Sequence, residues 1–178
     1  MPDLITIRDA APDEAAYLSA LALRSKAYWG YSREFIQSCK TELTYRPSQI
    51  ADERYHFVVA QLDAAAVGFY ALEAISPRQF ELEALFVDPQ HIGAGVGRQL
   101  MQHALDSVAA KSGESLLIQG DPNAEKFYLA AGAKLIGTRE SGSISGRHLP
   151  LFEILIRPLA GSGDDQRRGM ESPVSSQA

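Results

Sequence analysis

The spacing of hydrophobic residues predicts a strand followed by two helices in the first part of the chain. Residues 4–8 (LITIR) alternate weakly between apolar and polar positions, which is typical of a strand. Residues 13–28 have helical spacing. A second helix is expected over residues 32–42, with Ser32 at its start, and Pro47 is expected to close this region. The apolar face expected on the first helix consists of Ala16, Tyr17, Ala20, Leu21 and either Leu23 or Arg24.

The middle of the chain predicts three antiparallel strands. Residues 56–61 and 66–74 are rich in strand-forming residues, and residues 62–65 between them predict a hairpin turn. Residues 79–87 (QFELEALFV) predict a third strand. Strict alternation would divide this strand into one face with Glu81, Glu83, Leu85 and Val87 and another with Phe80, Leu82, Ala84 and Phe86.

Helical spacing returns at residue 97 and continues to residue 111, and Gly113 is placed to end that helix. The elements expected after it are a strand over 114–119, a short helix over 124–130 and strands over 134–139 and 149–157. Helices and strands are thus interspersed. The order predicts a three-layer α/β/α domain with a central mixed, mostly antiparallel sheet.

Composition places this domain within residues 1–159. The chain has 178 residues, 46% of them hydrophobic and 22% charged, which is typical of one globular domain. Residues 160–178 are rich in Gly, Ser and charged residues, and we expect them to form a flexible C-terminal tail.

Charge and cysteine content exclude several classes of protein. A net charge of −5 argues against a nucleic-acid-binding protein. The only cysteine, Cys39, excludes an internal disulfide and a cysteine-rich metal site, so we expect no metal and a reducing cytoplasm. The N-terminal residues do not resemble a targeting segment, and no run approaches the roughly 20 apolar residues of a membrane span.

A turn with three glycines, HIGAGVGR at residues 91–98, stands between a strand and a helix. The first amides of a helix have no partner within it, and glycines let a phosphate approach them closely. The spacing does not fit a P-loop, which needs a lysine after its glycines, or a dinucleotide fingerprint, in which the third glycine comes one residue later. A tight turn without a ligand is the alternative interpretation.

Two segments resemble the GNAT superfamily of N-acetyltransferases. Residues 85–98 (LFVDPQHIGAGVGR) are similar to its acetyl-CoA-binding motif, and residues 123–133 (NAEKFYLAAGA) are similar to its second, Tyr-containing motif. Alignment on the last two glycines places Ile92 where the family has Gln or Arg, whereas Gln90 fits the literal pattern. With Ile92 there, phosphate binding would depend mainly on backbone amides.

The resemblance implies acetyl-CoA as co-substrate and assigns its binding residues. The pantetheine arm and thioester would lie along Leu85, Phe86 and Val87. The pyrophosphate would be bound by Ile92, Gly93, Ala94, Gly95, Val96, Gly97 and Arg98. Asn123 would bind pantetheine or, alternatively, cap the helix that follows it.

The same resemblance suggests catalytic roles. Tyr128 would protonate the departing thiolate, unless it is simply an aromatic core residue. Glu83, or less favourably Glu81, would accept the proton of the amine, unless both are solvated strand residues. His56 and His148 are weaker candidates.

The acceptor site is expected beside Trp29 and Tyr31, which alternatively pack two helices together, with residues 141–148 as a flexible rim. Three hypotheses follow: an acetyltransferase that acts by direct transfer on the primary amine of a small molecule or, less favourably, on an exposed amine of a protein, a non-catalytic acetyl-CoA sensor, and a nucleotide-binding regulatory protein. Whether the chain forms a homodimer is left open.

Overall fold

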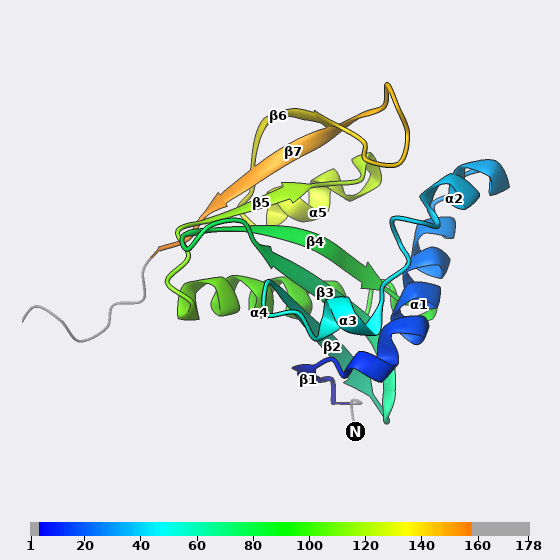
Figure 1. The fold of residues 1–178 in the computed structure, drawn as a ribbon, viewed down its shortest axis with the longest axis horizontal. Helices are drawn as coiled ribbons and strands as arrows, with labels where there is room; N and C mark the ends of the chain where they lie inside the picture. The colour runs from blue at the N-terminus through cyan, green and yellow to red at the C-terminus, as the bar shows by residue number, and fades with distance from the viewer. Residues whose placement is uncertain (1–3, 158–178) are drawn as a thin grey trace, which may run out of the picture.

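The computed structural model describes residues 4–157, so the predicted C-terminal tail lies outside the described residues. One seven-stranded sheet in the order β1-β2-β3-β4-β5-β7-β6 forms the centre of the domain (Figure 1). All neighbouring strands are antiparallel except β4 and β5, which are parallel. The predicted three-layer fold with a mixed, mostly antiparallel sheet is confirmed.

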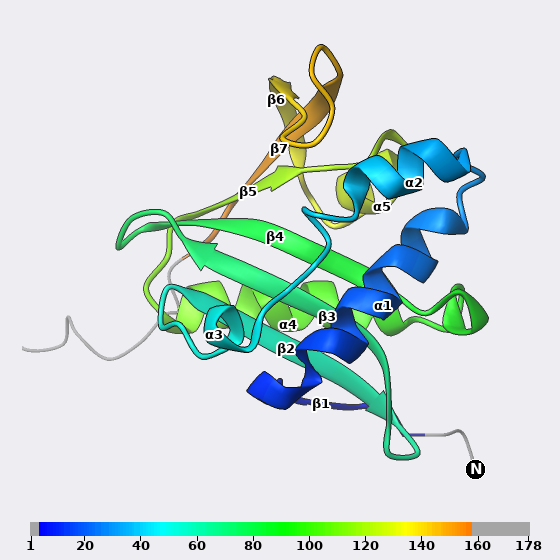
Figure 2. The ribbon, with the colours of Figure 1, turned by 45° about the vertical axis from the view of Figure 1, so that its right-hand side comes forward.

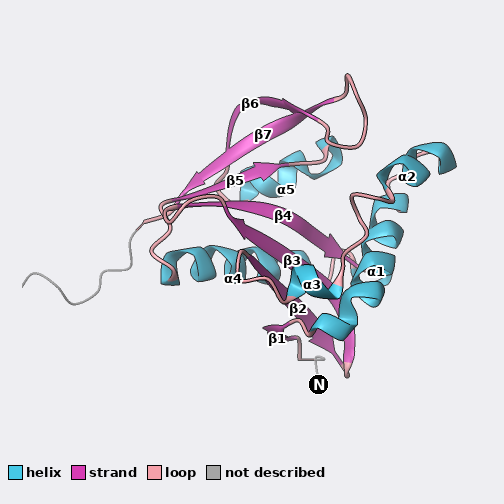
Figure 3. Ribbon diagram, in the orientation of Figure 1, coloured by secondary structure: helices cyan, strands magenta, loops and turns pink. Residues whose placement is uncertain are grey.

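The strands and helices agree closely with the sequence pattern (Figure 3). The strands are β1 (Thr6–Asp9), β2 (Tyr55–Leu62), β3 (Ala65–Ala74), β4 (Gln79–Val87), β5 (Ser115–Gln119), β6 (Lys134–Glu140) and β7 (His148–Leu155). The α-helices are α1 (Ala15–Ala27), α2 (Arg33–Cys39), α3 (Pro47–Ile50), α4 (Val96–Ala110) and α5 (Glu125–Ala130). The 3-10 turns are η1 (Pro12–Glu14), η2 (Pro89–His91) and η3 (Pro122–Ala124).

Each face of the sheet has its own hydrophobic core (Figure 2). One core lies between the sheet and helices α4 and α5, where Leu100 and Phe152 are fully buried. The other lies under α1, α2 and α3, where Leu18 and Phe69 are fully buried. Burial of apolar surface on both faces fixes the sheet between two layers of helices.

The parallel strands β4 and β5 pair only at their beginnings. Their ladder runs from Gln79 and Ser115 to Glu81 and Leu117 and then stops, although both strands continue. They diverge beyond that point (Figure 1). The divergence leaves the β5-facing backbone groups of β4 without ladder partners along the rest of the strand.

A β-bulge at Glu83 changes the predicted faces of β4. Ala71 of β3 faces Ala84, but the next residue, Leu72, faces Leu82, so Glu83 is the extra residue. Beyond the bulge, Leu85 packs on the α4 side and Ala84 on the α1 side. The prediction that Leu85 and Val87 share a face with Glu81 and Glu83 is therefore wrong, because an inserted residue reverses the alternation.

Three local predictions about helices also need correction. The face predicted on α1 is correct at Leu21 but wrong at Ala16 and Tyr17, because most of the helix is apolar and Leu18 lies in the core in their place. Pro47 begins the short helix α3 instead of closing the region. Ser112, with φ +60°, turns the chain after α4, whereas at Gly113 a Cβ would clash with the side chains of Val108 and Phe80.

Candidate active site

A cavity of about 720 Å³ opens where β4 and β5 diverge. Its walls come from β4 between Glu81 and Val87, the glycine turn, the loop after β5, helix α5 and the region from α1 to α3. Residues of both sequence motifs therefore meet at one site. The cavity exists because the sheet separates there while its two halves remain covered by helices.

The glycine turn forms a bare N-terminus for α4. Gly93 and Gly95 have φ angles of +87° and +85°, and a Cβ added to either would meet nothing within 4 Å. Gly95 is the N-cap residue of α4, so the amides that follow it point out of the helix. Gly97 brings α4 close to α5, because a Cβ there would lie 3.4 Å from the Phe127 ring. This arrangement fits a pyrophosphate group, as the open backbone and the helix dipole favour an anion.

Most residues predicted to bind acetyl-CoA line the cavity. The lining members of that set are Leu85, Phe86, Val87, Ile92, Gly93, Gly95, Gly97, Arg98 and Asn123. Ala94 and Val96 do not line it. The Val96 side chain is buried in the core below the turn, next to Gly68, so only the backbone of Val96 is available to a ligand.

Tyr128 extends from α5 to the cavity and is 7% exposed. Burial, together with the negative charge of Asp121, raises the pKa of the Tyr128 hydroxyl, so it keeps its proton at neutral pH. Its ring packs against Phe152, with the centroids 5.8 Å apart. Tyr128 is therefore both a core aromatic residue and a protonated hydroxyl at the cavity wall.

Glu83 faces the cavity from the bulge in β4. Protein surrounds it closely enough that loss of hydration raises the pKa of its carboxyl group to about 8, with further contributions from the carboxylate of Glu73 and the charges of Glu81 and Glu42. Tyr45 lines the same part of the cavity and is 8% exposed. A carboxyl group with this pKa can exchange a proton near neutral pH.

The other acid–base candidates are less available. Glu81 lines the cavity but forms an ion pair with Arg139. His56 contacts Asp9 at 2.8 Å, and neither His56 nor His148 lines the cavity. Among the residues predicted from the sequence, Glu83 is the carboxyl group in the cavity with a raised pKa.

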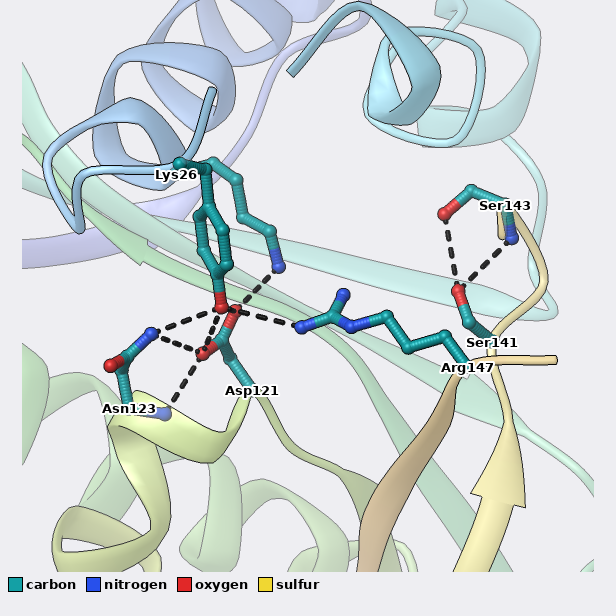
Figure 4. A network of polar contacts seen from close by, with 7 residues as sticks. Lys26, Asp121, Asn123, Ser141, Ser143 and Arg147 are labelled. Atoms are coloured by element: carbon teal, nitrogen blue, oxygen red, sulfur yellow. Dashed lines mark hydrogen bonds and ion pairs between the residues drawn. The ribbon is translucent and has the colours of Figure 1, made fainter. Parts of the chain in front are cut away.

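A polar network joins three segments beside the cavity (Figure 4). The Tyr31 hydroxyl, from the loop between α1 and α2, donates to Asp121 after β5 at 2.8 Å. Lys26 at the end of α1 forms an ion pair with Asp121 at 2.7 Å, and Arg147 before β7 donates to the Tyr31 oxygen at 3.3 Å. Burial opposes ionisation of Asp121, but Lys26, the backbone amide of Asn123 and the Tyr31 hydroxyl hold the pKa of its carboxyl group below the ordinary value.

Asn123 belongs to this network rather than to a helix cap. Its side-chain amide donates to the Tyr31 oxygen at 3.0 Å and to Asp121 at 2.9 Å. Asp121 caps η3 by accepting from the Asn123 backbone amide, and α5 begins after Ala124 without a side-chain cap. The predicted capping role of Asn123 is therefore wrong.

The predicted acceptor residues have different positions. Trp29 lines the cavity and is 45% exposed, with its ring edge-on to Tyr28. Tyr31 stacks on Phe35, with the centroids 4.1 Å apart, and uses its hydroxyl in the network. Stacking between the start of α2 and the preceding loop agrees with the alternative interpretation of Tyr31 as a packing residue.

Sequence reasoning gave no individual role to several polar residues of the cavity, among them Tyr45, Asp121 and Arg147, the last of which stood only within the expected rim of residues 141–148. Asp121 was recognisable only as a turn residue in Asp-Pro-Asn, and Tyr45 and Arg147 stand in segments without a motif. Their roles depend on contacts over long sequence separations, such as the 116 residues between Tyr31 and Arg147. Periodicity and local spacing carry no signal for such contacts.

A family model described as the acetyltransferase (GNAT) domain matches residues 10–141. The chain belongs to the GNAT acetyltransferase family. It is 30% identical over 152 residues to the peptidyl-lysine N-acetyltransferase YjaB of Escherichia coli (strain K12), covering 85% of this chain and 96% of that protein. This acyltransferase assignment favours the first of the three hypotheses.

Solved structures support the same fold. The PaiA N-acetyltransferase from Thermoplasma acidophilum in complex with coenzyme A superposes with a TM-score of 0.70 and 22% identity, over 84% of this chain and 98% of that one. The ribosomal-protein-S18-alanine N-acetyltransferase from Escherichia coli superposes with a TM-score of 0.65 and 17% identity, over 91% of this chain and 98% of that one.

Residues 4–157 contain neither a metal-binding cluster nor a membrane-spanning helix. No cluster of three or more His, Cys, Asp or Glu residues in that range has the arrangement to hold a metal ion. No helix in the same range is long and apolar enough to span a membrane.

Proposed function

We propose that this protein transfers an acetyl group from acetyl-CoA directly to the primary amine of a small molecule. The observation that carries this proposal is the single cavity in which the glycine turn, the unpaired part of β4, Glu83 and Tyr128 meet. Two independent sequence motifs thus contribute to one site that contains an acid and a base.

The glycine turn and β4 fit the two ends of acetyl-CoA. The amides after Gly95, with Arg98 in the first turn of α4, would bind the pyrophosphate. The free backbone groups of β4 from Leu85 to Val87 would hydrogen-bond the pantetheine arm. When bound, acetyl-CoA supplies an activated acetyl thioester.

Glu83 and Tyr128 provide opposite proton transfers. Glu83 would take a proton from the acceptor ammonium, whose ordinary pKa is about 10.4 in a lysine side chain, and its own raised pKa reduces the mismatch. Tyr128 would hold its proton until a thiolate develops beside its hydroxyl. Because both groups line one cavity, the amine would attack the thioester there directly. No acetylated intermediate of the enzyme is then needed.

The polar network supports a small acceptor. It joins the α1–α2 loop, the loop after β5 and the loop before β7 across the acceptor side of the cavity. These links restrict the approach of a folded protein surface. The name of the relative YjaB, a peptidyl-lysine N-acetyltransferase, supports a primary amine as the reacting group, and peptide acceptors therefore belong in the amine panel. A cytoplasmic location stays a prediction, and formation of a homodimer stays open.

Calorimetric titration with acetyl-CoA, NAD and ATP tests the proposed ligand. We expect saturable binding of acetyl-CoA and much weaker binding of both nucleotides. Binding of NAD or ATP without binding of acetyl-CoA would contradict the proposal.

A further inference from the structure

We propose that the acceptor carries a carboxylate and that Arg147 binds it. This inference rests on the proposed function and names the class of its substrate: a short amino acid or another amine with an anionic group. Arg147 lines the cavity from the loop between β6 and β7, on the side where Trp29 and Tyr31 were expected to contact the acceptor.

The charges of the cavity leave Arg147 available. Lys26 is paired with Asp121, and Arg139 is paired with Glu81. Arg98 belongs to the first turn of α4, at the glycine turn. Within residues 4–157, no carboxylate forms an ion pair with Arg147, and the Tyr31 oxygen accepts from one nitrogen of its guanidinium (Figure 4). A guanidinium has five N–H donors in a planar fork that matches a carboxylate, so donors remain for a ligand.

Aromatic rings hold the guanidinium in position. Its central carbon lies 4.7 Å from the Phe35 ring centroid and 5.6 Å from that of Tyr31. Stacking on ring faces orients the plane of the group and leaves its edge free for hydrogen bonds. The Tyr31 hydroxyl, itself held by Asp121, restricts it further.

The loop that carries Arg147 is closed by its own hydrogen bonds. The Ser141 amide donates to the Arg147 carbonyl at 2.6 Å, and the Gly146 amide donates to the Glu140 carboxylate at 2.8 Å. The Ser141 hydroxyl accepts from the amide of Ser143 (Figure 4) and also from the amide of Ile144. Residues 141–148, expected as a flexible rim, thus hold the backbone of Arg147 in place. A guanidinium on an ordered loop loses less entropy when it binds an anion.

The negative end of the same cavity gives the acceptor its orientation. Glu42 and Glu83 line the wall formed by β4 and the segment after α2, and the hydroxyl of the buried Tyr45 faces their charge. An ammonium group is attracted to the Glu42 carboxylate and to Glu83 once Glu83 has lost its proton, and a carboxylate is repelled there. An acceptor with both groups would therefore direct its amine to Glu83 and its carboxylate to Arg147.

The test compares acceptors that differ only in the carboxylate. Glycine, β-alanine, 4-aminobutyrate, 6-aminohexanoate and Nα-acetyl-lysine are each assayed against their carboxamides, with thiol release as readout, and phosphoethanolamine tests whether a phosphate serves instead. We expect at least one acid to exceed its amide by about tenfold to one hundredfold in kcat/KM. Cadaverine, a diamine without a carboxylate, is assayed beside them. The assignment of a carboxylate would be overturned if the amides or cadaverine were turned over in preference to every acid. It would also be overturned if phosphoethanolamine alone were turned over.

Arg147 variants locate the effect. Arg147→Gln should remove the preference for the acid by raising its KM, whereas turnover of the amide and the KM of acetyl-CoA stay within about twofold. Arg147→Glu should reverse the preference toward cadaverine. The exposed Arg78 provides a control, Arg78→Gln, that should change neither, and thermal unfolding of each variant reports on its folding. An increase in the KM of acetyl-CoA, or an unchanged preference, would show that Arg147 does not bind the acceptor.

Failure of this inference differs from failure of the proposed function. Release of CoA with amines but without any dependence on a carboxylate would leave the acetyltransferase proposal standing and overturn the substrate class. Absence of release with every amine, despite binding of acetyl-CoA, would contradict both.

Discussion

The hydroxyl of Tyr31 donates to the carboxylate of Asp121 at 2.8 Å, and this contact joins two segments that are 90 residues apart. It links the loop before α2 to the loop after β5, on opposite sides of the point where the sheet separates. The same oxygen accepts from Asn123 and Arg147. One phenol group thus joins three segments beside the cavity.

Removal of that hydroxyl should affect the acceptor more than acetyl-CoA. Tyr31→Phe keeps the stack on Phe35 but leaves donors of Asn123 and Arg147 without their acceptor. We expect a loss of about 1 kcal/mol in unfolding free energy and a several-fold increase in acceptor KM, with the KM of acetyl-CoA unchanged. Steady-state kinetics and denaturant unfolding measure both.

Tyr17→Phe is the matched control, because the Tyr17 hydroxyl donates to the Ala66 carbonyl outside the network. It should leave both KM values unchanged. Equal kinetic effects of the two substitutions would exclude a specific role for Tyr31.

Asp121 should make stability depend on pH at the acid end. The pKa of Asp121 is lowered in the folded state. Its contribution to the free energy of unfolding is therefore fully present above the ordinary carboxyl pKa and is lost as the pH falls through the pKa of the folded state. Asp121→Asn should cost about 2 kcal/mol at pH 7 and less at pH 3. The exposed pair of Arg78 and Glu114 gives the control: Glu114→Gln should cost about 0–1 kcal/mol. A loss for Asp121→Asn that does not change with pH would contradict the ion-pair account.

Glu83 should set the lower limb of the pH–rate profile. Its folded pKa of about 8 lies above the ordinary carboxyl value, so the fraction of free base, and with it kcat/KM, should rise as the pH increases through about 8. Glu83→Gln should lower kcat by about 10²–10⁴-fold and remove that limb. A profile with the same limb in both proteins would assign the titration to the acceptor amine or to another group.

A side chain at Gly95 should weaken acetyl-CoA binding. Asparagine tolerates positive φ, so Gly95→Asn places a side chain in the cradle with limited strain in the backbone. We expect the Kd of acetyl-CoA to increase tenfold or more by calorimetry. Gly132→Asn, at φ +95° after α5 and away from the cavity, is the control and should leave the Kd unchanged. If both substitutions weakened acetyl-CoA binding equally, the loss of affinity would be due to backbone strain and not to a side chain in the cradle.

Local patterns predicted the elements of the fold, and most of the residues that they indicated for acetyl-CoA binding line one cavity. The strand Gln79–Val87 has the predicted bounds, and the expected hairpin turn forms with positive φ at Asp63 and Ala64. The glycine turn was recognisable because its chemistry is local: an open backbone directly before a helix.

The surroundings of Glu83 and Asp121 were not predictable in the same way. The bulge at Glu83 depends on how β4 pairs with β3, and the cavity depends on where β5 separates from β4. The partners of Asp121 come from α1 and from the loop before α2. Such contacts arise where segments distant in the sequence pack together. The spacing of hydrophobic residues within one helix or strand carries no information about them.

Amine-dependent release of CoA by the unaltered protein and by Tyr128→Phe tests the central claim most directly. Thiol and acetylated amine should appear together in equal amounts, with no release before the amine is added, because transfer is direct. Tyr128→Phe should lower kcat by about 10²–10⁴-fold and change the Kd of acetyl-CoA less than about twofold. Release of thiol without amine, or a substitution that weakens acetyl-CoA binding alone, would contradict direct transfer with Tyr128 as the acid.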